Sequence, residues 1–289
     1  MNYRRRAGYL AYLFALPFLL LFTTFVILPL IYGLVLGFFR WDMLSPNPAR
    51  FVALENFREA FADAYFWRAL MATVRFVVLA VPLTIVLALS LAVGLNRVPR
   101  RRQAFYRAAY YLPTVITISV TGILWRWFYN SEFGLFNASL APFGIKIPWI
   151  TDPNWAMPSL VLMTLWWTVG GPMVALLAGL QNISPAYFEA AALDGATGWQ
   201  SFRSITLPLL RPVLVFVLVL NVIGGFQVFG QVYMITRGGP ELSTRTLVQY
   251  IYETAFNNYR MGYAAALSWL LFLVIGFFSV IQFRMMRER

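Results

Sequence analysis

Few residues in this sequence are of the kinds that carry out chemistry, and their types exclude most catalytic and metal sites. Cysteine and histidine are both absent, which excludes disulfides, thiolate or imidazole metal ligation, and nucleophiles activated by histidine. The only lysine, Lys146, follows an isoleucine, so the Gly-Lys of a phosphate-binding loop is missing. We therefore expect no catalysis by this chain and no cofactor or metal bound to it. Paired carboxylates would still allow glycosyl transfer, but no such spacing occurs among Asp42, Glu55, Glu59 and Asp63.

The composition indicates that lipid is the solvent for most of the chain. Of its 289 residues, 60% are hydrophobic, 18% aromatic and only 12% charged. The mean hydropathy of +0.68 is typical of an integral membrane protein. The formal net charge is +12, and all but one of the 23 basic residues are arginine. Because these arginines cluster beside apolar runs, they predict contact with an anionic membrane surface and not with nucleic acid.

Six apolar segments reach the length of about 20 residues that a helix needs to cross the hydrocarbon core. The sequence therefore predicts an all-α integral membrane protein, with residues 1–289 forming one transmembrane domain. The first segment follows three arginines, as in a signal peptide, but it exceeds the roughly 7–15 apolar residues of a cleavable signal, so we expect an uncleaved span. The segments lie near residues 10–38, 70–95, 108–129, 158–181, 209–235 and 263–283.

The arginines also predict the orientation of the chain. Six spans place both termini on one side of the membrane, together with the loops 96–107 and 182–208. Because basic residues accumulate in cytoplasmic loops, we expect this side to be the cytoplasm. It holds three acids, against thirteen basic residues: Arg4, Arg5, Arg6, Arg97, Arg100, Arg101, Arg102, Arg107, Arg203, Arg211, Arg284, Arg287 and Arg289.

Two alternative functions are disfavoured by the acids. No Asp or Glu lies in any predicted span, whereas carriers driven by ion gradients usually need an intramembrane carboxylate. This absence counts against a secondary active solute carrier, as does the lack of a detectable inverted repeat. A membrane enzyme is disfavoured because the external acids form no recognisable catalytic arrangement.

The polar segment 182–208 predicts two short helices joined by a turn. Ser-Pro at 184–185 is typical of a helix start, because the serine hydroxyl can cap free N–H groups and proline suits the first helical position. Gly195 follows the run "AYFEAAALD", where a left-handed glycine can end the helix. Thr197 can cap a second helix, and Pro208 is expected to begin the next span. The sequence thus predicts a cytoplasmic helix-turn-helix.

Residue types alone leave two interpretations of this loop open. In the first, Ala190, Ala191 and Ala192 let another protein approach the backbone closely. Glu189 and Asp194 then offer negative charge to a basic partner. In the second, the alanines reflect helix propensity, and the loop is an amphipathic hairpin on the membrane surface.

The spacing within "EAAALDGATGWQSFRSITLP" resembles the EAA loop of binding-protein-dependent ABC importer permeases. That pattern is E-A-A, three residues to Gly, then I-x-L-P about nine residues further on. The resemblance continues through "LWWTVGGPMVALLAGLQNISPAYFEAAALDGA" and "VFGQVYMITRGGPELSTRTLVQYIYETAF", and it is particularly close to the maltose and glycerol-phosphate subgroup. The positions in register are Glu189, Ala190, Ala191, Gly195, Ile205, Leu207 and Pro208.

This resemblance implies a permease subunit of an ATP-driven importer for a sugar or sugar-like solute, in the bacterial inner membrane. It implies three protein partners: a second permease chain, a cytoplasmic ATPase dimer that binds ATP and Mg²⁺, and an external solute-binding protein. The loop would be a coupling helix that docks on the ATPase. The residues expected to couple are Glu189, Ala190, Ala191, Asp194, Gly195, Ala196, Ile205, Leu207 and Pro208.

A path for such a solute would need polar and aromatic side chains near the membrane midplane. Hydroxyl groups pair with amides, and sugar rings lie against aromatic rings. Each candidate has a structural alternative that is at least as probable, as a helix–helix hydrogen bond or an interfacial aromatic. The candidates are Trp166 and Thr168 on the fourth span, and Asn221, Gln227 and Gln231 on the fifth.

Overall fold

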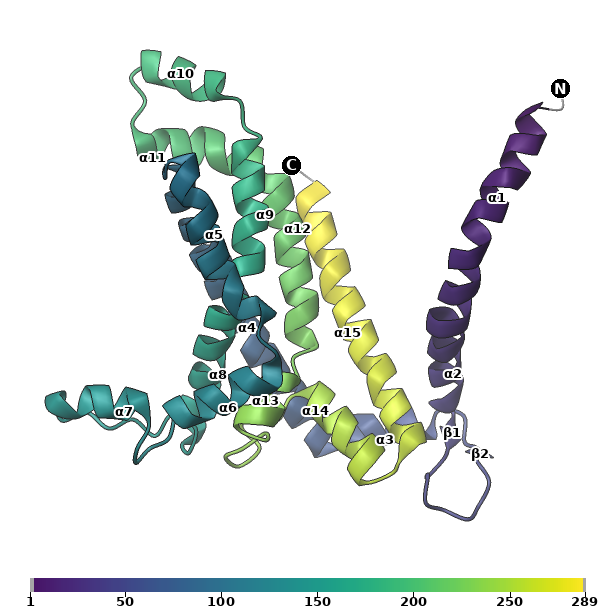
Figure 1. Cartoon of the computed structure of the whole chain (residues 1–289). Helices are drawn as coiled ribbons and strands as arrows, with labels where there is room; N and C mark the ends of the chain where they lie inside the picture. The colour runs from purple at the N-terminus through teal and green to yellow at the C-terminus, as the bar shows by residue number, and fades with distance from the viewer. Residues whose placement is uncertain (1–2, 288–289) are drawn as a thin grey trace. The chain divides into compact units, whose positions relative to one another are not determined.

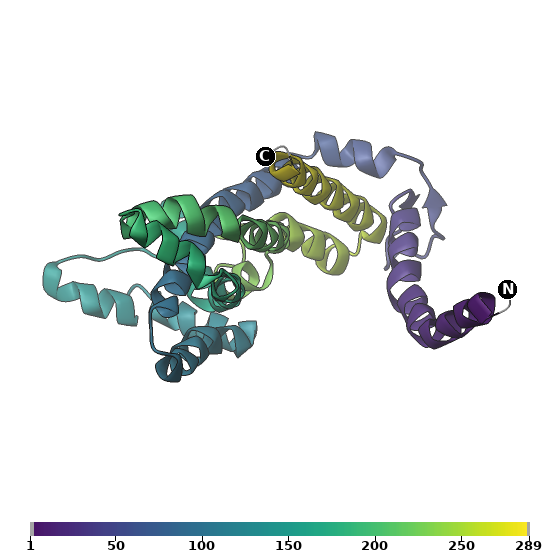
Figure 2. The same cartoon turned by 90° about the horizontal axis from the view of Figure 1, so that it is seen from above.

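The structure is a computed structural model that describes residues 3–287 and the side chains of residues 13–284, and it is largely helical (Figures 1 and 2). The α-helices are α1 (Tyr3–Phe22), α2 (Leu28–Leu36), α3 (Glu55–Ala62), α4 (Ala64–Asn96), α5 (Arg100–Val115), α6 (Ile118–Phe128), α7 (Leu135–Leu140), α8 (Pro153–Thr168), α9 (Gly170–Gln181), α10 (Pro185–Leu193), α11 (Gly198–Ser201), α12 (Leu207–Phe226), α13 (Gly230–Ile235), α14 (Leu247–Tyr252) and α15 (Met261–Arg287). The other elements are the π-helical turns η1 (Thr23–Ile27), η3 (Phe202–Thr206) and η4 (Glu253–Asn257), the 3₁₀ turn η2 (Ala141–Phe143), and the antiparallel strands β1 (Phe39–Arg40) and β2 (Arg50–Phe51).

The chain folds into two compact units. Unit 1 comprises the residues up to Ala64 together with Ile251–Phe272, and unit 2 comprises Tyr65–Tyr250 together with the residues from Leu273 onward. Within unit 2, α10 and α11 lie at one end and α7 at the other (Figure 1). Figure 2 looks onto the end that carries α10 and α11.

Among the described residues, four continuous helical stretches are long and apolar enough to cross a membrane: Leu13–Leu36, Ala64–Asn96, Gly198–Phe226 and Met261–Arg284. Two bent pairs, α5 with α6 and α8 with α9, raise the number to six if each pair forms one span. The predicted all-α membrane architecture of about six spans is thereby confirmed, although three of the predicted spans differ in detail.

The third predicted span, 108–129, is not one helix. It is divided between α5 and α6, whose axes differ by 94°. Ile116 and Thr117 between them have extended backbone, and Pro113 has no N–H to donate to the last turn of α5. Helix α5 also begins before the predicted span, so residues 100–107 are helical although the sequence predicts a loop there.

The fourth span, predicted as one helix over 158–181, bends by 50° at Val169, between α8 and α9. Gly170 begins α9 at a point where the backbone of α5 passes very close. A Cβ at Gly170 would lie 2.5 Å from the carbonyl oxygen of Tyr110 and 2.7 Å from the Cα of Tyr111. The missing side chain therefore allows α5 to pack against the bend.

The fifth predicted span, 209–235, is shifted toward the N-terminus. Helix α12 ends at Phe226, after Gly224 and Gly225, whose conformational freedom weakens the last turn. Helix α13 is separate. At its other end α12 is continuous with α11 through η3, giving one helix of 29 residues. Pro208 lies in the first turn of α12, as the sequence predicts, but it does not start a new helix there, because the helix continues from α11.

A π-helical turn allows this helix to pass its proline. Leu207 donates its backbone N–H to Phe202, five residues back, immediately before Pro208. The same arrangement occurs at residues 23–29, where η1 precedes a proline. Proline lacks an N–H and its ring collides with the carbonyl four residues earlier, so the wider turn removes that collision. Both helices continue past the proline.

One face of α4 forms the centre of unit 2. Small side chains on this face let neighbouring helices approach closely. The N-terminal half of the face packs with α6, α8 and α13, and the C-terminal half packs with α9 and α12. The buried row repeats every four residues: Ala72, Phe76, Ala80, Thr84, Ala88 and Ala92.

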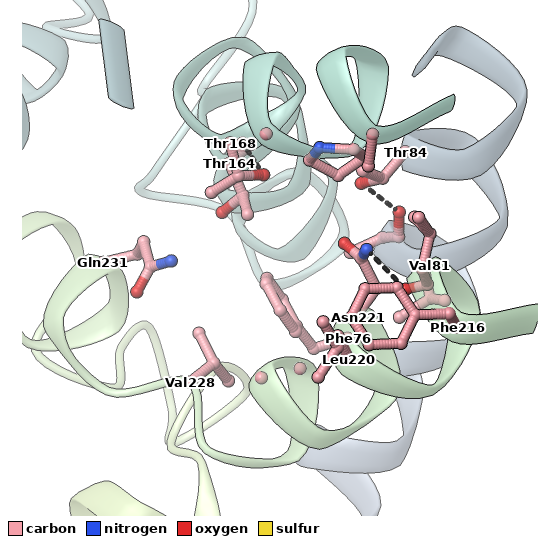
Figure 3. Close-up of a pocket in the computed structure, with 17 residues that line it drawn as sticks. Phe76, Val81, Thr84, Thr164, Thr168, Phe216, Leu220, Asn221, Val228 and Gln231 are labelled. Atoms are coloured by element: carbon pink, nitrogen blue, oxygen red, sulfur yellow. Dashed lines mark hydrogen bonds between the residues drawn. The ribbon is translucent and has the colours of Figure 1, made fainter. Parts of the chain in front are cut away.

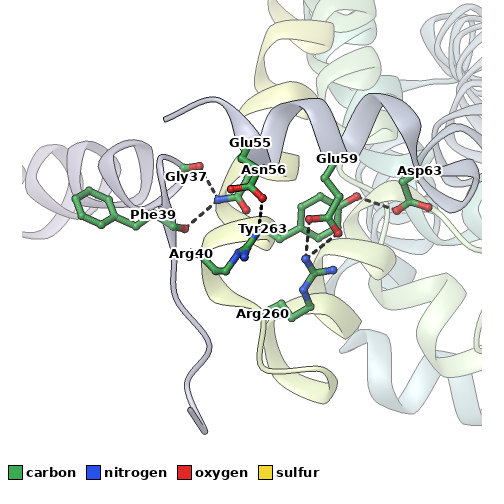
Figure 4. Close-up of polar contacts among 9 residues, drawn as sticks. All are labelled: Gly37, Phe39, Arg40, Glu55, Asn56, Glu59, Asp63, Arg260 and Tyr263. Carbon is green, nitrogen blue, oxygen red and sulfur yellow. Dashed lines mark hydrogen bonds and ion pairs between the residues drawn. The ribbon is translucent and has the colours of Figure 1, made fainter. Parts of the chain in front are cut away.

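Polar contacts in unit 1 join α3 to the segments on either side of it (Figure 4). Three acids of this region are spaced four residues apart, on one face, and each has a partner. The pairs are Arg40 with Glu55, Arg260 with Glu59 at 2.7 Å between Nη2 and Oε1, and Tyr263 with Asp63 at 2.8 Å between the hydroxyl and Oδ2. These contacts connect the β1–β2 hairpin, α3 and the start of α15.

The ion pair of Arg260 is partly exposed. Burial lowers the pKa of Arg260, but the hydrogen bond and the negative charge of Glu59 outweigh it, so the pKa lies above its ordinary value. The side chains are 41% and 38% exposed. A pair with this exposure contributes at most about 1 kcal/mol to the free energy of unfolding.

Asn56 makes the buried polar contact of unit 1. It is 3% exposed, and its Nδ2 donates to the carbonyl oxygens of Gly37 and Phe39, each at 2.9 Å. Gly262 lies against the same segment, where a Cβ would overlap the Phe39 carbonyl oxygen. The amide of Asn56 therefore satisfies two carbonyl groups where the chain leaves α2.

We expect Asn56→Asp to destabilise unit 1, because a carboxylate would face the two carbonyl oxygens without a hydrogen to donate. The free energy of unfolding should fall by about 1–3 kcal/mol. Glu55→Gln is the matched control, since it is also isosteric but lies in an exposed pair, and should cost less than about 1 kcal/mol. Thermal unfolding of the purified chains in detergent measures both, and equal losses would contradict the role assigned to Asn56.

Candidate functional site

A cavity of about 390 Å³ lies inside unit 2, among α4, α8, α9, α12 and α13 (Figure 3). This volume is in the range of small-molecule sites. Much of the wall is apolar, including the rings of Phe76 and Phe216, and none of the lining residues is charged. The polar side chains of the lining are Thr84, Thr164, Thr168, Asn221 and Gln231.

Most of these polar groups already donate their hydrogens within the protein. Each of the three threonines bonds the carbonyl four residues earlier in its own helix, and Asn221 does the same through its Nδ2. The oxygen atoms of these side chains therefore remain as hydrogen-bond acceptors. The bonds are Thr84 to Ala80, Thr164 to Leu160, Thr168 to Thr164 and Asn221 to Val217, all at 2.8 Å.

Gln231 differs from the other polar residues of the cavity. Its side chain makes no hydrogen bond within the part of the chain that the structure describes, so both its amide hydrogens and its oxygen are available. It comes from α13, across the cavity from Asn221 (Figure 3). The polar part of the wall is thus rich in acceptor oxygens, and Gln231 supplies uncommitted donors.

The structure brings three of the five predicted path residues together and leaves two outside. Thr168, Asn221 and Gln231 line the cavity. Trp166 precedes Thr168 by two residues, which turns it to another face of α8, and its ring lies 5.5 Å from that of Trp125. Gln227 is exposed just after the last turn of α12 and does not reach the cavity.

Sequence reasoning missed four polar or aromatic residues of the lining, Phe76, Thr84, Thr164 and Phe216. A signal existed for the threonine on α8, which lies one helical turn before Thr168 and therefore on the same face. Phe76 and Thr84 also share one row of α4. Which face of each helix meets the others depends on packing, and the apolar pattern of a membrane span does not specify it.

The second site is the hairpin formed by α10 and α11. Helix α10 ends as expected at Gly195, whose φ of +76° is the left-handed conformation that glycine adopts without strain. Ala196 donates its N–H to Ala191 at 2.9 Å, and Gly195 donates to Ala192 at 3.1 Å. These two bonds form a Schellman motif, which satisfies the last carbonyl groups of α10.

Caps define the other helix ends of the hairpin. Thr197 forms a capping box with Gln200: the Thr197 hydroxyl accepts from the Gln200 N–H, and the Gln200 side chain accepts from the Thr197 N–H at 2.7 Å. Ser184 has the backbone conformation of an N-cap, but its side chain makes no capping hydrogen bond. The expectation that its hydroxyl caps α10 is therefore wrong.

Little of α10 is covered by the rest of the chain. None of its residues is buried, and Leu193 is 90% exposed. Trp199 of α11 is 68% exposed and its ring stacks on Phe202. The predicted coupling residues Glu189, Ala190, Asp194 and Gly195 are exposed on the hairpin, Ala191 and Ala196 are half-buried there, and Ile205, Leu207 and Pro208 lie on the helix that follows.

The two acids of the hairpin have no ion pair within the described residues. Glu189 lies beside a groove of about 530 Å³ between α10 and the end of α9, and Arg100 and Gln103 line the groove from the side of α5. Gln103 is buried and donates to the Leu95 carbonyl oxygen at 3.0 Å. It also accepts a hydrogen bond from Gln181 of α9 at 3.0 Å. These amides connect the end of α9 to α5 and α4.

Comparisons with known proteins agree with this architecture. Residues 66–288 match the family described as binding-protein-dependent transport system inner membrane component. The lactose transport system permease protein LacF of Rhizobium radiobacter is 36% identical over 96% of this chain and 94% of its own length. The trehalose/maltose transport system permease protein MalF of Thermococcus litoralis is 34% identical over 98% of this chain and 96% of its own.

A solved structure shares the fold over nearly the whole chain. It is a chain of a bacterial alginate ABC transporter, crystallised in complex with an alginate pentasaccharide-bound periplasmic protein. It is 25% identical, with a TM-score of 0.83, over 98% of this chain and 96% of that one. The match over residues 66–288 and these full-length likenesses establish that this chain belongs to the family of binding-protein-dependent transport system inner membrane components.

Proposed function

We propose that this chain is a permease subunit of an ATP-driven ABC importer and that it carries a neutral sugar or sugar-like solute. The family places it among the membrane components of such systems, and LacF and MalF belong to systems named for lactose and for trehalose and maltose. A second permease chain would complete the path, because each subunit of such a pair contributes one wall.

The proposal of a neutral sugar as the solute rests on the polar and aromatic groups that line the cavity. Its acceptor oxygens suit a molecule with many hydroxyl donors, and its aromatic rings suit the apolar face of a sugar ring. A carboxylate or phosphate would meet acceptors without a cation and would lose its hydration. The uncharged lining, with Thr168 and Asn221 opposite Gln231, therefore favours neutral polyhydroxylated solutes.

The uncovered hairpin supports docking of a cytoplasmic ATPase dimer, which would bind ATP and Mg²⁺ in place of this chain. Leu193 and Trp199 are large apolar side chains that a partner surface would bury. Closure of the ATPase dimer would then move α10 and α11 together with the helices continuous with them. That is a rigid-body switch between two packed states and involves no chemistry in this chain.

On the opposite side of the membrane, an external solute-binding protein would deliver the solute. The family description names such a protein, and the related alginate transporter was crystallised with its periplasmic protein. The basic residues around the start of α5 and the end of α15 support cytoplasmic termini in the inner membrane of a bacterium.

We expect Thr168→Val to weaken solute recognition without changing the shape of the cavity, because valine is isosteric and removes only the hydroxyl, that is, the acceptor oxygen and the bond donated to the Thr164 carbonyl. Losing one neutral hydrogen bond should raise the KM for uptake by about 2–10-fold. Uptake into proteoliposomes of the assembled transporter measures this, with radiolabelled neutral disaccharides as solutes and sugar phosphates and uronic-acid oligosaccharides as anionic counterparts.

Thr114→Val is the matched control. Thr114 bonds a carbonyl of its own helix at 2.6 Å but does not line the cavity, so uptake should be unchanged. Equal KM values for the two variants, or uptake of the anionic sugars in preference to the neutral ones, would contradict the assignment of the cavity.

Gly195→Asp should uncouple the transporter. A side chain at φ +76° costs about 1 kcal/mol or more, although the structure has room for it, so the chain should still insert. We expect normal amounts of protein in the membrane, almost no ATP-dependent uptake, and less ATPase co-purified with the permease. Glu189→Ala should have a milder effect, since an ion pair at an interface rim contributes little.

Gly198→Asp provides the comparison for Gly195→Asp. Gly198 also has open space around it, but it is the first residue of α11, where an acid is favourable. The same charge should therefore be tolerated there. Full transport with an intact complex in Gly195→Asp would mean that the hairpin is only an interfacial element.

The topology can be tested with single cysteines, because the chain has none of its own. Ser139 of α7 and Arg101 of α5 are exposed and lie at opposite ends of unit 2. We expect Ser139→Cys to react with a membrane-impermeant maleimide in whole spheroplasts, and Arg101→Cys to react only after the membrane is permeabilised. The reverse labelling would place the termini outside the cell.

A further inference from the structure

A groove of about 400 Å³ runs along the hairpin formed by the end of α4 and the start of α5. It is separate from the solute cavity and lies on a different side of α5 from Gln103, which faces α9 and α10. One end of the groove is apolar, with Leu91 and Gly94 on α4. The other end is basic, with Arg97 and Arg102 on either side of the turn.

Tyrosines line the groove on the side of α5. Tyr106 and Tyr110 lie one helical turn apart on α5, and both line it. They are 41% and 37% exposed. From the turn, the guanidinium groups are therefore followed by phenol rings on α5 and by Gly94 and Leu91 on α4. A phospholipid likewise has its charge at one end, in the phosphate, and its apolar carbon at the other, in the acyl chain.

Gly94 leaves the apolar end open. A Cβ at this position would meet no atom within 4 Å. Gly94 is the one glycine of α4, and it is exposed. The space above Gly94 is thus wide enough for an added side chain. An acyl chain can lie in it, against Leu91 and the phenol rings.

The arginines have no counter-charge in this region. From residue 64 to residue 131 the sequence contains no Asp or Glu, and the described residues show no ion pair for Arg97 or Arg102. Three consecutive arginines also occupy the first turn of α5, where the helix dipole disfavours cations. An anion bound in the groove would relieve both sources of repulsion.

The depth of the groove in the membrane matches a headgroup. Helix α4 has 33 residues and at 1.5 Å per residue is about 50 Å long, well over the roughly 30 Å of the hydrocarbon core. Its final turns therefore leave the core, and the tyrosines lie where aromatic residues concentrate at an interface. Basic pockets at this depth on the cytoplasmic side select anionic headgroups.

We propose that this groove binds one anionic phospholipid of the cytoplasmic leaflet, with the phosphate between Arg97 and Arg102 and an acyl chain over Gly94. The assignment of the leaflet rests on the orientation proposed above. The lipid would fill the gap along the α4–α5 hairpin, whose other groove carries the amide contacts to the end of α9. Binding there would hold in place the helices against which the coupling hairpin moves.

The test is native mass spectrometry of the full chain in detergent, titrated with phosphatidylglycerol or with phosphatidylcholine. The wild-type chain should retain one phosphatidylglycerol at least tenfold more tightly than phosphatidylcholine. Two variants address the two ends of the site: Arg97→Gln with Arg102→Gln removes the charge, and Gly94→Leu fills the apolar end without changing the charge. Each should weaken the tight site tenfold or more.

Matched controls distinguish this site from general lipid contact. Arg126→Gln with Arg237→Gln removes the same charge near the other end of unit 2, and Gly276→Leu adds the same side chain where a Cβ also meets no atom within 4 Å. Both should bind as the wild type does, with circular dichroism confirming that all variants fold. Loss of binding in the controls, or tight binding retained in Gly94→Leu, would overturn the proposal.

Soluble competitors identify the source of the phosphate. Inorganic phosphate and glycerol 3-phosphate at millimolar concentration should not displace the lipid, because they lack the acyl chain. Displacement by either would show that the arginines bind a free anion, and would overturn the assignment to a lipid without affecting the proposed transport of sugars.

Discussion

In the hydrocarbon core of a membrane every backbone N–H and C=O has to be paired within the protein, because no water is present to bind it. Helices meet this requirement only while they remain continuous. The bend at Val169 and the end of α12 at Phe226 are therefore permitted only where protein or a polar cavity receives the freed groups. Both interruptions border the cavity, which Gly171 and Gly225 line.

The same requirement determines the polarity of the cavity. A hydroxyl or amide inside a span has to donate its hydrogen, and the nearest acceptor is the carbonyl one turn back. Thr84, Thr168 and Asn221 all follow this rule. Once these donors are used internally, the polar part of the surface left to a solute consists mainly of oxygen atoms. A preference for hydroxyl donors thus follows from the way in which polar side chains are accommodated in lipid.

The cavity and the cytoplasmic hairpin are mechanically linked by two helices. Helix α9 begins at the cavity and ends four residues before α10, and the helix through α11 and α12 runs from the hairpin to Asn221. The two pack closely, since a Cβ at Gly179 would lie 2.7 Å from the side chain of Leu210. Each of these two helices therefore connects the hairpin directly to the wall of the cavity.

The sequence predicted the apolar segments and the turn of the hairpin better than it predicted where individual helices bend and which of their faces point inward. Hydropathy sums identified all six apolar segments, and the types of Gly195 and Thr197 gave the turn, because capping depends on local geometry. The break at Ile116 was missed, because the apolar residues of α5 and α6 together have the length and composition of one membrane span. Trp166 and Gln227 were assigned to the path because polarity does not specify which face of a helix points inward.

The π turn before Pro208 has a consequence for the register of the hairpin. Such a turn contains one residue more than the α-helix it interrupts. Deletion of one residue between Phe202 and Thr206 would replace the wide turn with an α-helical one, which would leave the parts on its two sides in nearly the same orientation but would return the Pro208 ring to the carbonyl four residues before it. The wide turn thus absorbs the extra residue, so that the helix passes its proline while α10 and α11 keep nearly the azimuth that a regular helix would give them, whereas a deletion elsewhere in α12 would rotate them by about 100°.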